Sequence, residues 1–130
     1  MVTDPIGDLI NRIKTASAVR KPHTEVPYSK FVDNVAHALK KAGYLSSIEK
    51  KGALFSKDLV LGLSYFEGEP RIHGAERVSK PSRRVYQRCE DIRGYRSGFG
   101  NTFFSTPKGV LTDAEARKLK VGGEVLFRIW

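Results

Sequence analysis

Apolar side chains near the start of the chain recur with the period of a helix. Four of them follow the i, i+3, i+4, i+7 spacing of one buried stripe: Ile6, Leu9, Ile10 and Ile13. Asp4 is a suitable N-cap and Pro5 suits the first helical position, so we predict that a helix begins there. Arg12 follows Asp8 by four residues on the outer face, where it is either half of an exposed ion pair or free to meet a partner.

A second amphipathic stretch begins at Ser29, and strand patterns surround it. Its inward positions are Val32, Val35, Ala36 and Leu39. Gly43 suits a left-handed helix end. Residues 24–27 have the pattern of a short edge strand, and further strands are predicted at 45–50 and 58–65. The order α-β-α-β-β is typical of an α+β unit in which helices cover a small sheet.

The turn residues Glu67-Gly68-Glu69-Pro70 interrupt this pattern and mark a boundary. Beyond it the predicted elements are strands at 72–79, 84–87 and 101–106, one helical turn at 90–95, and a last strand in which Val125, Phe127 and Ile129 alternate with Leu126, Arg128 and Trp130. We therefore expect an α+β fold with two subdomains. An N-terminal α-β-α-β-β subdomain spans 1–66, and a mostly β C-terminal subdomain with short helices spans 67–130.

Local signals are densest between Gly98 and Asp113. The strand at 101–106 leads into Ser105-Thr106-Pro107-Lys108-Gly109, and Thr112-Asp113-Ala114-Glu115 fits a capping box, so a helix should begin at Thr112. An exposed loop held at both ends by regular structure would result. Its hydroxyl groups can bond sugar and base edges, and Lys108 can meet a phosphate, so the loop suits close approach to a polyanion.

The charge of the chain favours the same kind of partner. There are 23 Lys and Arg against 14 Asp and Glu, which gives a formal charge of +9 and a pI near 9.9. Nine of the eleven arginines follow residue 66. Because arginine meets phosphate with a rigid fork and stacks on bases, the second half is the expected contact surface. The simpler alternative is that the net positive charge only keeps the protein soluble.

Aromatic residues are interleaved with these basic side chains. The basic positions are Lys80, Arg83, Arg84, Arg88, Arg93 and Arg96, and the aromatic ones are Tyr86 and Tyr95. This mixture suits phosphate contact together with base stacking. The competing interpretation places Tyr86 in the core beside Val85 and leaves the arginines solvated, and the pattern alone favours neither.

Several separated motifs resemble bacterial-type ribosomal protein S8 of the small subunit. They are Asp4-Pro5-Ile6, Asn11-Arg12-Ile13-Lys14, Arg77-Val78-Ser79-Lys80-Pro81, Arg84-Val85-Tyr86, the Gly-x-Gly at Gly98, the Ser-Thr-x-Lys-Gly-Val-x-Thr-Asp from Ser105, and the Gly-Gly-Glu that ends at Glu124. The resemblance runs along most of the chain and implies the same two-part layout. It also implies a non-catalytic protein that binds an irregular helix of small-subunit ribosomal RNA, supports assembly beside neighbouring ribosomal proteins and, as often in this family, represses its own messenger RNA.

The resemblance assigns RNA contact to the Ser-Thr-x-Lys-Gly loop, to the Gly-Gly-Glu turn and to the tyrosine of Arg-x-Tyr. With the basic residues around these motifs, the predicted RNA-binding set is Arg12, Lys14, Arg84, Tyr86, Arg88, Ser105, Thr106, Pro107, Lys108, Gly109 and Glu124. Glu124 beside a polyanion would have to accept base protons or steady the loop, unless it is an ordinary turn carboxylate. Two positions depart from the family pattern. Pro107 stands where a second serine is usual, which removes a hydroxyl and a backbone donor, and Thr15 replaces a common asparagine.

The sequence lacks the residues that characterise other functional classes. Ser105-Thr106-Pro107-Lys108 matches the S-x-x-K pattern of penicillin-binding proteins and β-lactamases, but the Ser-Asp-Asn and Lys-Thr-Gly partners are absent. The three histidines and Cys89 lack metal-ligand spacing, so we expect no metal, cofactor or small-molecule substrate. DNA is the nearer alternative to RNA, because net charge does not distinguish the two.

The cysteine count and the apolar runs bear on location. A single cysteine allows no intrachain disulfide, and no run approaches eighteen apolar residues, so we expect a reducing compartment and no membrane. A ribosome-associated protein of the cytoplasm fits these features, as does the mature form of an organellar one.

Overall fold

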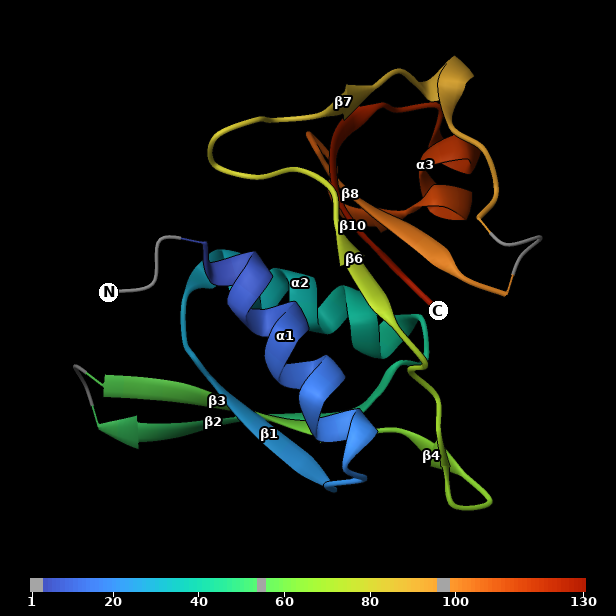
Figure 1. Ribbon diagram of the computed structural model, residues 1–130. Coiled ribbons are helices and arrows are strands. Elements are labelled where there is room, and N and C mark those ends of the chain that lie inside the picture. Colours follow the sequence, from blue (N-terminus) through green and yellow to red (C-terminus); the bar gives the residue numbers. More distant parts are fainter. Residues whose placement is uncertain (1–3, 54–55, 96–98) are drawn as a thin grey trace.

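The computed structural model describes residues 4–53, 56–95 and 99–130 and has an α+β fold with two principal sheets. Figure 1 shows helices α1 (Pro5–Ala18) and α2 (Lys30–Lys41) lying over one face of a sheet built from β1 (His23–Pro27), β2 (Leu45–Ala53) and β3 (Ser56–Leu63). The sheet is antiparallel with the order β1–β3–β2, so β1 is an edge strand as predicted. The α-β-α-β-β order of the first half is confirmed.

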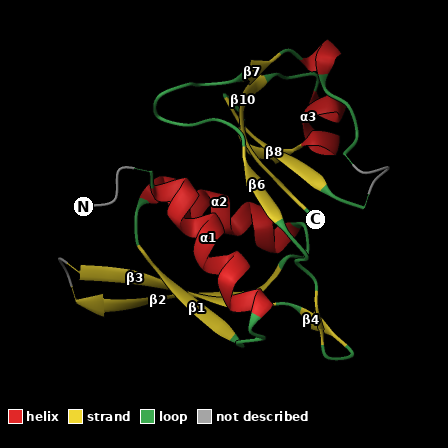
Figure 2. Cartoon of the chain, in the orientation of Figure 1, coloured by secondary structure: helices red, strands yellow, loops and turns green. Residues whose placement is uncertain are grey.

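The second sheet is arranged around the last strand. Its elements are β6 (Ala75–Arg77), β7 (Tyr86–Gln87), β8 (Asn101–Thr106), β9 (Gly109–Thr112) and β10 (Gly123–Ile129). The order is β6–β10–β8–β9, and β7 pairs with β10 beside β6. A small hairpin of β4 (Tyr65–Phe66) and β5 (Glu69–Pro70) follows the first sheet, while a 3-10 helix, η1 (Cys89–Asp91), and α3 (Asp113–Leu119) complete the chain (Figure 2).

The helices begin where the capping residues predict. Ser29 Oγ accepts the backbone N–H of Val32, and Gly43 follows α2 with a φ of 92°. The capping box of α3 forms completely, because Thr112 and Glu115 each bond the backbone of the other. Asp4 is the N-cap residue of α1, but its carboxylate makes no capping bond and binds Arg77 instead. Among the described helices, the longest has 14 residues and none is long and apolar enough to cross a membrane.

Several strand boundaries differ from the expectation. The strands predicted at 72–79 and 84–87 shorten to Ala75–Arg77 and Tyr86–Gln87, and the helical turn predicted at 90–95 is the 3-10 helix Cys89–Asp91. The segment between β6 and β7 bends into a tight turn, in which Lys80 and Arg83 exchange two backbone hydrogen bonds. The predicted loop after Thr106 is also shorter, because β9 pairs with β8 from Gly109 onward and leaves only Pro107 and Lys108 between the strands.

The apolar core has two clusters that meet at β8 and β10. The larger cluster combines both long helices and the first sheet with Phe103 of β8 and Phe127 of β10, whose rings stack with their centroids 5.0 Å apart. The smaller cluster lies under α3 and contains Phe104 and Val125. Adjacent phenylalanines of β8 therefore point to opposite faces. A β-bulge in β10 between Val125 and Phe127 adjusts that strand to the two clusters.

We expect Phe103→Ala to destabilise the whole protein in one cooperative step. The side chain is fully buried in a cluster that joins the two sheets, and deletion of a buried phenylalanine ring costs about 3–5 kcal/mol. Urea unfolding followed by far-ultraviolet circular dichroism and by Trp130 fluorescence should give coincident, shifted midpoints. Phe99→Ala is the matched control, since Phe99 is 80% exposed and its loss should change stability by less than about 0.5 kcal/mol. Two separate transitions in the variant would contradict a shared core.

Candidate nucleic-acid interface

Three predicted site residues from distant parts of the sequence lie in one row across the second sheet. Glu124 of β10 pairs with Tyr86 of β7 on one side and with Ser105 of β8 on the other. Directly opposed residues of antiparallel strands project from the same face, so the three side chains are neighbours. Val110 of β9 extends the row beyond Ser105.

The Gly122-Gly123 pair makes this row possible. A Cβ atom at Gly122 would overlap the backbone around Gln87, and one at Gly123 would overlap the carbonyl group of Ser105. Only glycine lets three backbones approach this closely, so the first two residues of the Gly-Gly-Glu motif set the spacing between β7, β10 and β8.

The opposite face of the same strands is buried. Phe104, Leu111 and Val125 belong to the smaller core cluster under α3, and the partly buried Val85 packs against it. The alternation of a strand therefore sends Tyr86 outward, where it is 69% exposed. The interpretation that places the Tyr86 ring in the core is wrong.

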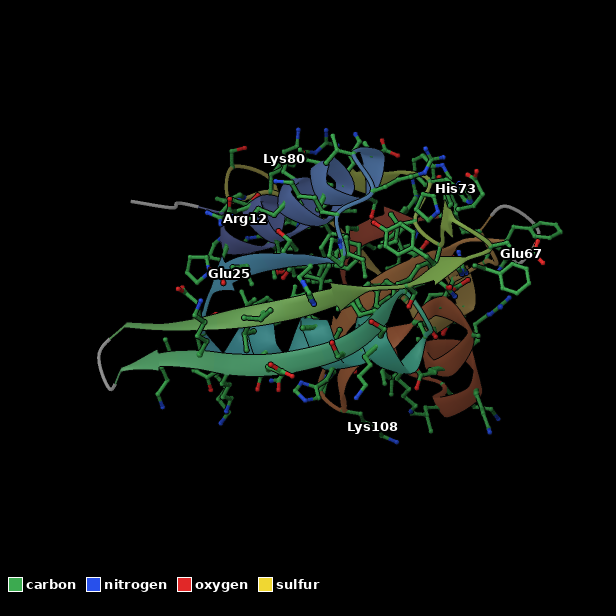
Figure 3. All side chains as sticks on the ribbon, turned by 90° about the horizontal axis from the view of Figure 1, so that it is seen from below. Arg12, Glu25, Glu67, His73, Lys80 and Lys108 are labelled. Atoms are coloured by element: carbon green, nitrogen blue, oxygen red, sulfur yellow. The ribbon has the colours of Figure 1, made fainter. Side chains whose placement is uncertain are left out.

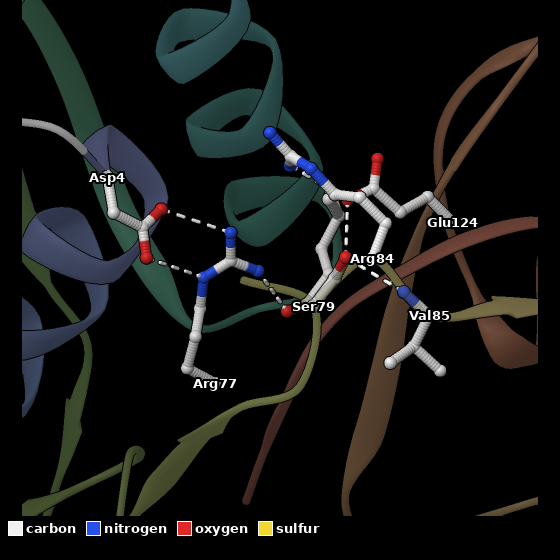
Figure 4. Close-up of polar contacts among 7 residues, drawn as sticks. Asp4, Arg77, Ser79, Arg84, Val85 and Glu124 are labelled. Atoms are coloured by element: carbon white, nitrogen blue, oxygen red, sulfur yellow. Dashed lines mark hydrogen bonds and ion pairs between the residues drawn. The ribbon is translucent and has the colours of Figure 1, made fainter. Parts of the chain in front are cut away.

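Glu124 is bonded within the protein. Its Oε2 atom accepts hydrogen bonds from Ser79 Oγ at 2.5 Å and from Arg84 Nη1 at 3.1 Å (Figure 4). Ser79 Oγ in turn accepts the backbone N–H of Val85 at 3.2 Å. This chain of contacts fixes the Lys80-to-Arg84 turn beside β10 and holds the Arg84 guanidinium near the row. The carboxylate is thus more than an ordinary turn residue.

The turn between β8 and β9 is also ordered by its own side chain. Thr106 Oγ1 donates to the carbonyl oxygen of Gly109 at 2.8 Å and accepts the backbone N–H of Lys108 at 3.1 Å. In the described part of the chain, neither the Ser105 hydroxyl nor the Lys108 ammonium has a hydrogen-bond or ion-pair partner. Within this motif Thr106 maintains the turn, and Ser105 and Lys108 remain available to a ligand.

A groove beside Ser105 was not predicted from the sequence. It encloses about 480 Å³ between α2 and the β8–β9 hairpin, and α2 contributes Phe31, Asn34, His37, Ala38 and Lys41. The available signal was the position of Phe31, which falls outside the buried stripe of α2 and is 41% exposed.

An ion pair at the edge of this groove links α2 to α3, with Lys41 Nζ 2.8 Å from Glu115 Oε2. The hydrogen bond and charge of Glu115 raise the pKa of Lys41. Burial favours a higher pKa for Glu115, but the bonds from Lys41 and Thr112 hold it below its usual value.

The remaining predicted residues are not all brought to the row. Arg88 directly precedes η1, next to the close approach of Gly122. Arg12 bonds Asp8 at 3.0 Å and the carbonyl oxygen of Glu25 at 2.9 Å, which confirms the exposed ion pair. Figure 3 shows Arg12 and Lys108 on opposite sides of the molecule, and Lys14 is on the same helix as Arg12. Arg96 and Gly98 lie outside the described residues.

A partly buried ion pair connects α1 to the sheet that carries the row. Arg77 donates to both carboxylate oxygens of Asp4, at 3.1 and 3.0 Å, and to the carbonyl oxygen of Leu126 at 2.5 Å (Figure 4). Burial by itself would raise the pKa of Asp4, but the hydrogen bonds and charge of Arg77 hold that pKa below its usual value. The two halves of the chain are therefore joined by a charged contact as well as by the core.

Comparison with known proteins gives matches along the whole chain. The family model described as ribosomal protein S8 matches residues 4–130. The small ribosomal subunit protein uS8 of Persephonella marina is 45% identical in an alignment of 138 positions, which covers all of both chains. The protein of the same name from Rhizorhabdus wittichii is 43% identical over 129 residues, covering 99% of this chain and 98% of its own.

The Asp4–Arg77 pair should make stability depend on pH in the acid range. A carboxyl group whose pKa is lower in the folded state contributes stability above its unfolded pKa, about 3.9, and loses that contribution as the pH falls through the folded pKa. We expect Asp4→Asn to lower the free energy of unfolding by on the order of 1.5 kcal/mol at pH 7 and by much less near pH 2. Denaturant titrations of both chains across this range measure the difference. A gap that stays constant with pH would mean that the charge of Asp4 is unimportant.

Proposed function

Because the chain belongs to the ribosomal protein S8 family, we propose that it is a structural, non-catalytic component of the small ribosomal subunit that binds small-subunit ribosomal RNA directly. The observation that carries the RNA-binding part is the Tyr86–Glu124–Ser105 row, with the free Lys108 beside it. An exposed ring and an available hydroxyl lie on one sheet face, and an unpaired cation lies in the adjoining β8–β9 turn.

The chemistry of these groups suits an irregular RNA helix. The deep major groove of regular A-form RNA admits no side chains, so proteins contact distorted loops, minor-groove edges and 2′-hydroxyls. The exposed Tyr86 ring can stack on an unpaired base, and Ser105 Oγ can donate to or accept from a base edge or a 2′-hydroxyl. Lys108 and Arg84 supply positive charge for the flanking phosphates. The groove between α2 and the β8–β9 hairpin offers room for a nucleotide that leaves the stack.

The surface is organised before RNA arrives. Thr106 fixes the β8–β9 turn, and Glu124 fixes Arg84 and the turn before β7. Binding therefore needs little ordering of these segments, which reduces the entropic cost of association. A preformed surface of this kind is suited to hold one fold of the RNA during subunit assembly. A messenger RNA that presents the same fold would bind there too, and repression of the chain's own message would follow by competition.

Binding to an isolated internal-loop helix of small-subunit ribosomal RNA tests this function. We expect saturable binding by the full chain, with weaker binding to a helix of the same sequence in DNA, because DNA lacks the 2′-hydroxyls. Equal affinity for the two would favour the DNA-binding alternative. The own-message proposal is tested by competition between the ribosomal helix and the leader of the chain's messenger RNA.

Lys108→Ala and Ser105→Ala should weaken RNA binding in different ways. Lysine–phosphate contact releases counterions, so Lys108→Ala should reduce the slope of log affinity against log salt by about one unit. Ser105→Ala should leave that slope nearly unchanged but reduce discrimination against RNA with an altered internal loop. Filter binding at several salt concentrations measures both effects.

Lys118→Ala is the matched charge control for this pair. Lys118 is exposed on α3, which covers the opposite face of the sheet from the row, so its loss should not change the salt slope. An unchanged slope in Lys108→Ala would place that lysine away from the RNA.

Pro107→Ser should change affinity by less than about tenfold. Serine would supply a hydroxyl and a backbone N–H, each able to contribute about 0.5–1.5 kcal/mol if it meets a partner on the RNA. Loss of the proline ring would also loosen the unbound turn at a cost of roughly 0.4–1 kcal/mol. Because tenfold in affinity is about 1.4 kcal/mol, these opposing contributions leave a small difference. Affinities of both chains for the same helix, at one salt concentration, measure it. A hundredfold loss would show that the proline ring itself makes an essential contact.

A further inference from the structure

The β4–β5 hairpin presents a large apolar side chain to solvent. Phe66 is 76% exposed, whereas its neighbour Tyr65 packs against the larger core cluster. Phe66 pairs across the hairpin with Glu69, and no contact of its ring with another aromatic group or cation occurs in the described part of the structure. An exposed phenylalanine on a short projecting hairpin has the form of an anchor for a partner's pocket.

The hairpin is held firmly at its base. Tyr65 Oη donates to the carbonyl oxygen of Lys21 at 2.5 Å, and Arg20 Nη2 lies 3.2 Å from Glu69 Oε1. The backbone N–H of Arg71 donates to the carbonyl oxygen of Ser64 at 2.9 Å and closes the hairpin. These contacts tie the hairpin to the end of α1, so its backbone needs little further ordering when a partner binds.

The turn at the tip is unusual for its residue types. Glu67 and Gly68 both have positive φ angles, 52° and 81°, as a type I′ turn requires. Glycine, asparagine or aspartate normally occupies the first of these positions, because other side chains are strained there. The turn therefore holds a glutamate carboxylate next to Phe66 at some cost in stability. In the described residues Glu67 has no ion-pair partner.

The charge around Phe66 indicates which class of partner it meets. Residues 64–70 contain two glutamates and no lysine or arginine, although the chain as a whole carries +9. Glu69 is already paired with Arg20, so Glu67 is the hairpin carboxylate that has no ion-pair partner among the described residues. An unpaired carboxylate directly beside an exposed phenylalanine fits a protein surface that offers a cation next to an apolar pocket. Figure 1 also shows β4 at the opposite end of the molecule from β7, which carries one edge of the RNA-binding row.

We propose that the β4–β5 hairpin docks on a second protein, whose surface has lysine or arginine side chains around an apolar pocket. Phe66 fills the pocket and Glu67 meets the surrounding cations. The source of this partner rests on the proposed function, because a second protein of the small ribosomal subunit is then the natural neighbour.

A photoreactive phenylalanine analogue at position 66 tests the proposal in assembled subunits. The full chain carrying this residue is expressed in cells, and the small subunits are purified in high salt and irradiated. We expect a cross-link to a basic protein, within a segment that contains lysine or arginine. A cross-link to RNA, to a second copy of this chain or to an acidic protein overturns the proposal, as does none at all. If the label at position 66 keeps the chain out of subunits, the same label is placed at position 67 and the results are interpreted in the same way.

Two substitutions then measure the interaction with the cross-linked protein after its purification. Phe66→Ala should weaken binding at least about 30-fold, which is the size of a hot-spot truncation. Glu67→Lys should also weaken binding, and its effect should be larger in low salt than in high salt. Leu119→Ala, an exposed apolar control on α3, should change this affinity less than about twofold. Equal binding by wild type and Phe66→Ala overturns the proposal.

RNA binding separates this proposal from the function on which it rests. Affinity for the ribosomal RNA helix should be unchanged in Phe66→Ala, because the hairpin is remote from the row. Absence of the wild-type chain from purified subunits would instead refute the ribosomal function.

Discussion

The arrangement of the second sheet depends on strand β10, which has apolar core on both faces and a paired strand on both edges. One edge is hydrogen-bonded to β6 and β7 and the other to β8, while Phe127 and Val125 enter different core clusters. The position of Glu124 follows from this arrangement, and the positions of Tyr86 and Ser105 follow from their pairing with Glu124. A displacement of β10 would therefore disperse the candidate site, even though β10 supplies only one of the three side chains.

The larger core cluster connects the first half of the chain to β8 and β10, so the first half also helps to hold these strands in place. Residues before the Glu67-to-Pro70 turn pack in one cluster with Phe103 and Phe127, and Arg77 binds Asp4 at the start of α1. The groove beside Ser105 likewise has one wall from α2. The two halves of the chain therefore form one scaffold for the proposed RNA-binding surface.

The sequence was most informative where a local motif has one geometric solution. The capping box at Thr112 and the helix cap at Ser29 need only their own neighbours, and the strand at 101–106 is indicated by its β-branched and aromatic residues; the structure contains all three. Strand β9 was missed because Gly109 and Val110 form a strand only through pairing with β8. The bond from Asp4 to Arg77 spans 73 positions, and a good capping residue gave no sign that its carboxylate would be used elsewhere. Alternation alone could not decide whether Tyr86 faces inward, since that depends on which face of β10 meets α3. The predicted RNA contacts themselves rest on the family resemblance, and the structure adds their spatial grouping.

Glu124 explains how a carboxylate can belong to a surface for RNA. It accepts from Ser79 and Arg84 on the same oxygen, so part of its charge is neutralised before any ligand binds. A phosphate that approached Arg84 would compete with Glu124 for the guanidinium, but the five N–H groups of arginine allow both contacts at once. The bond from Ser79 would keep the carboxylate in place in either case. In the proposed complex Glu124 would therefore orient a cation toward the RNA and limit the repulsion that an unpaired carboxylate would cause, so an acidic residue is compatible with the centre of such a site.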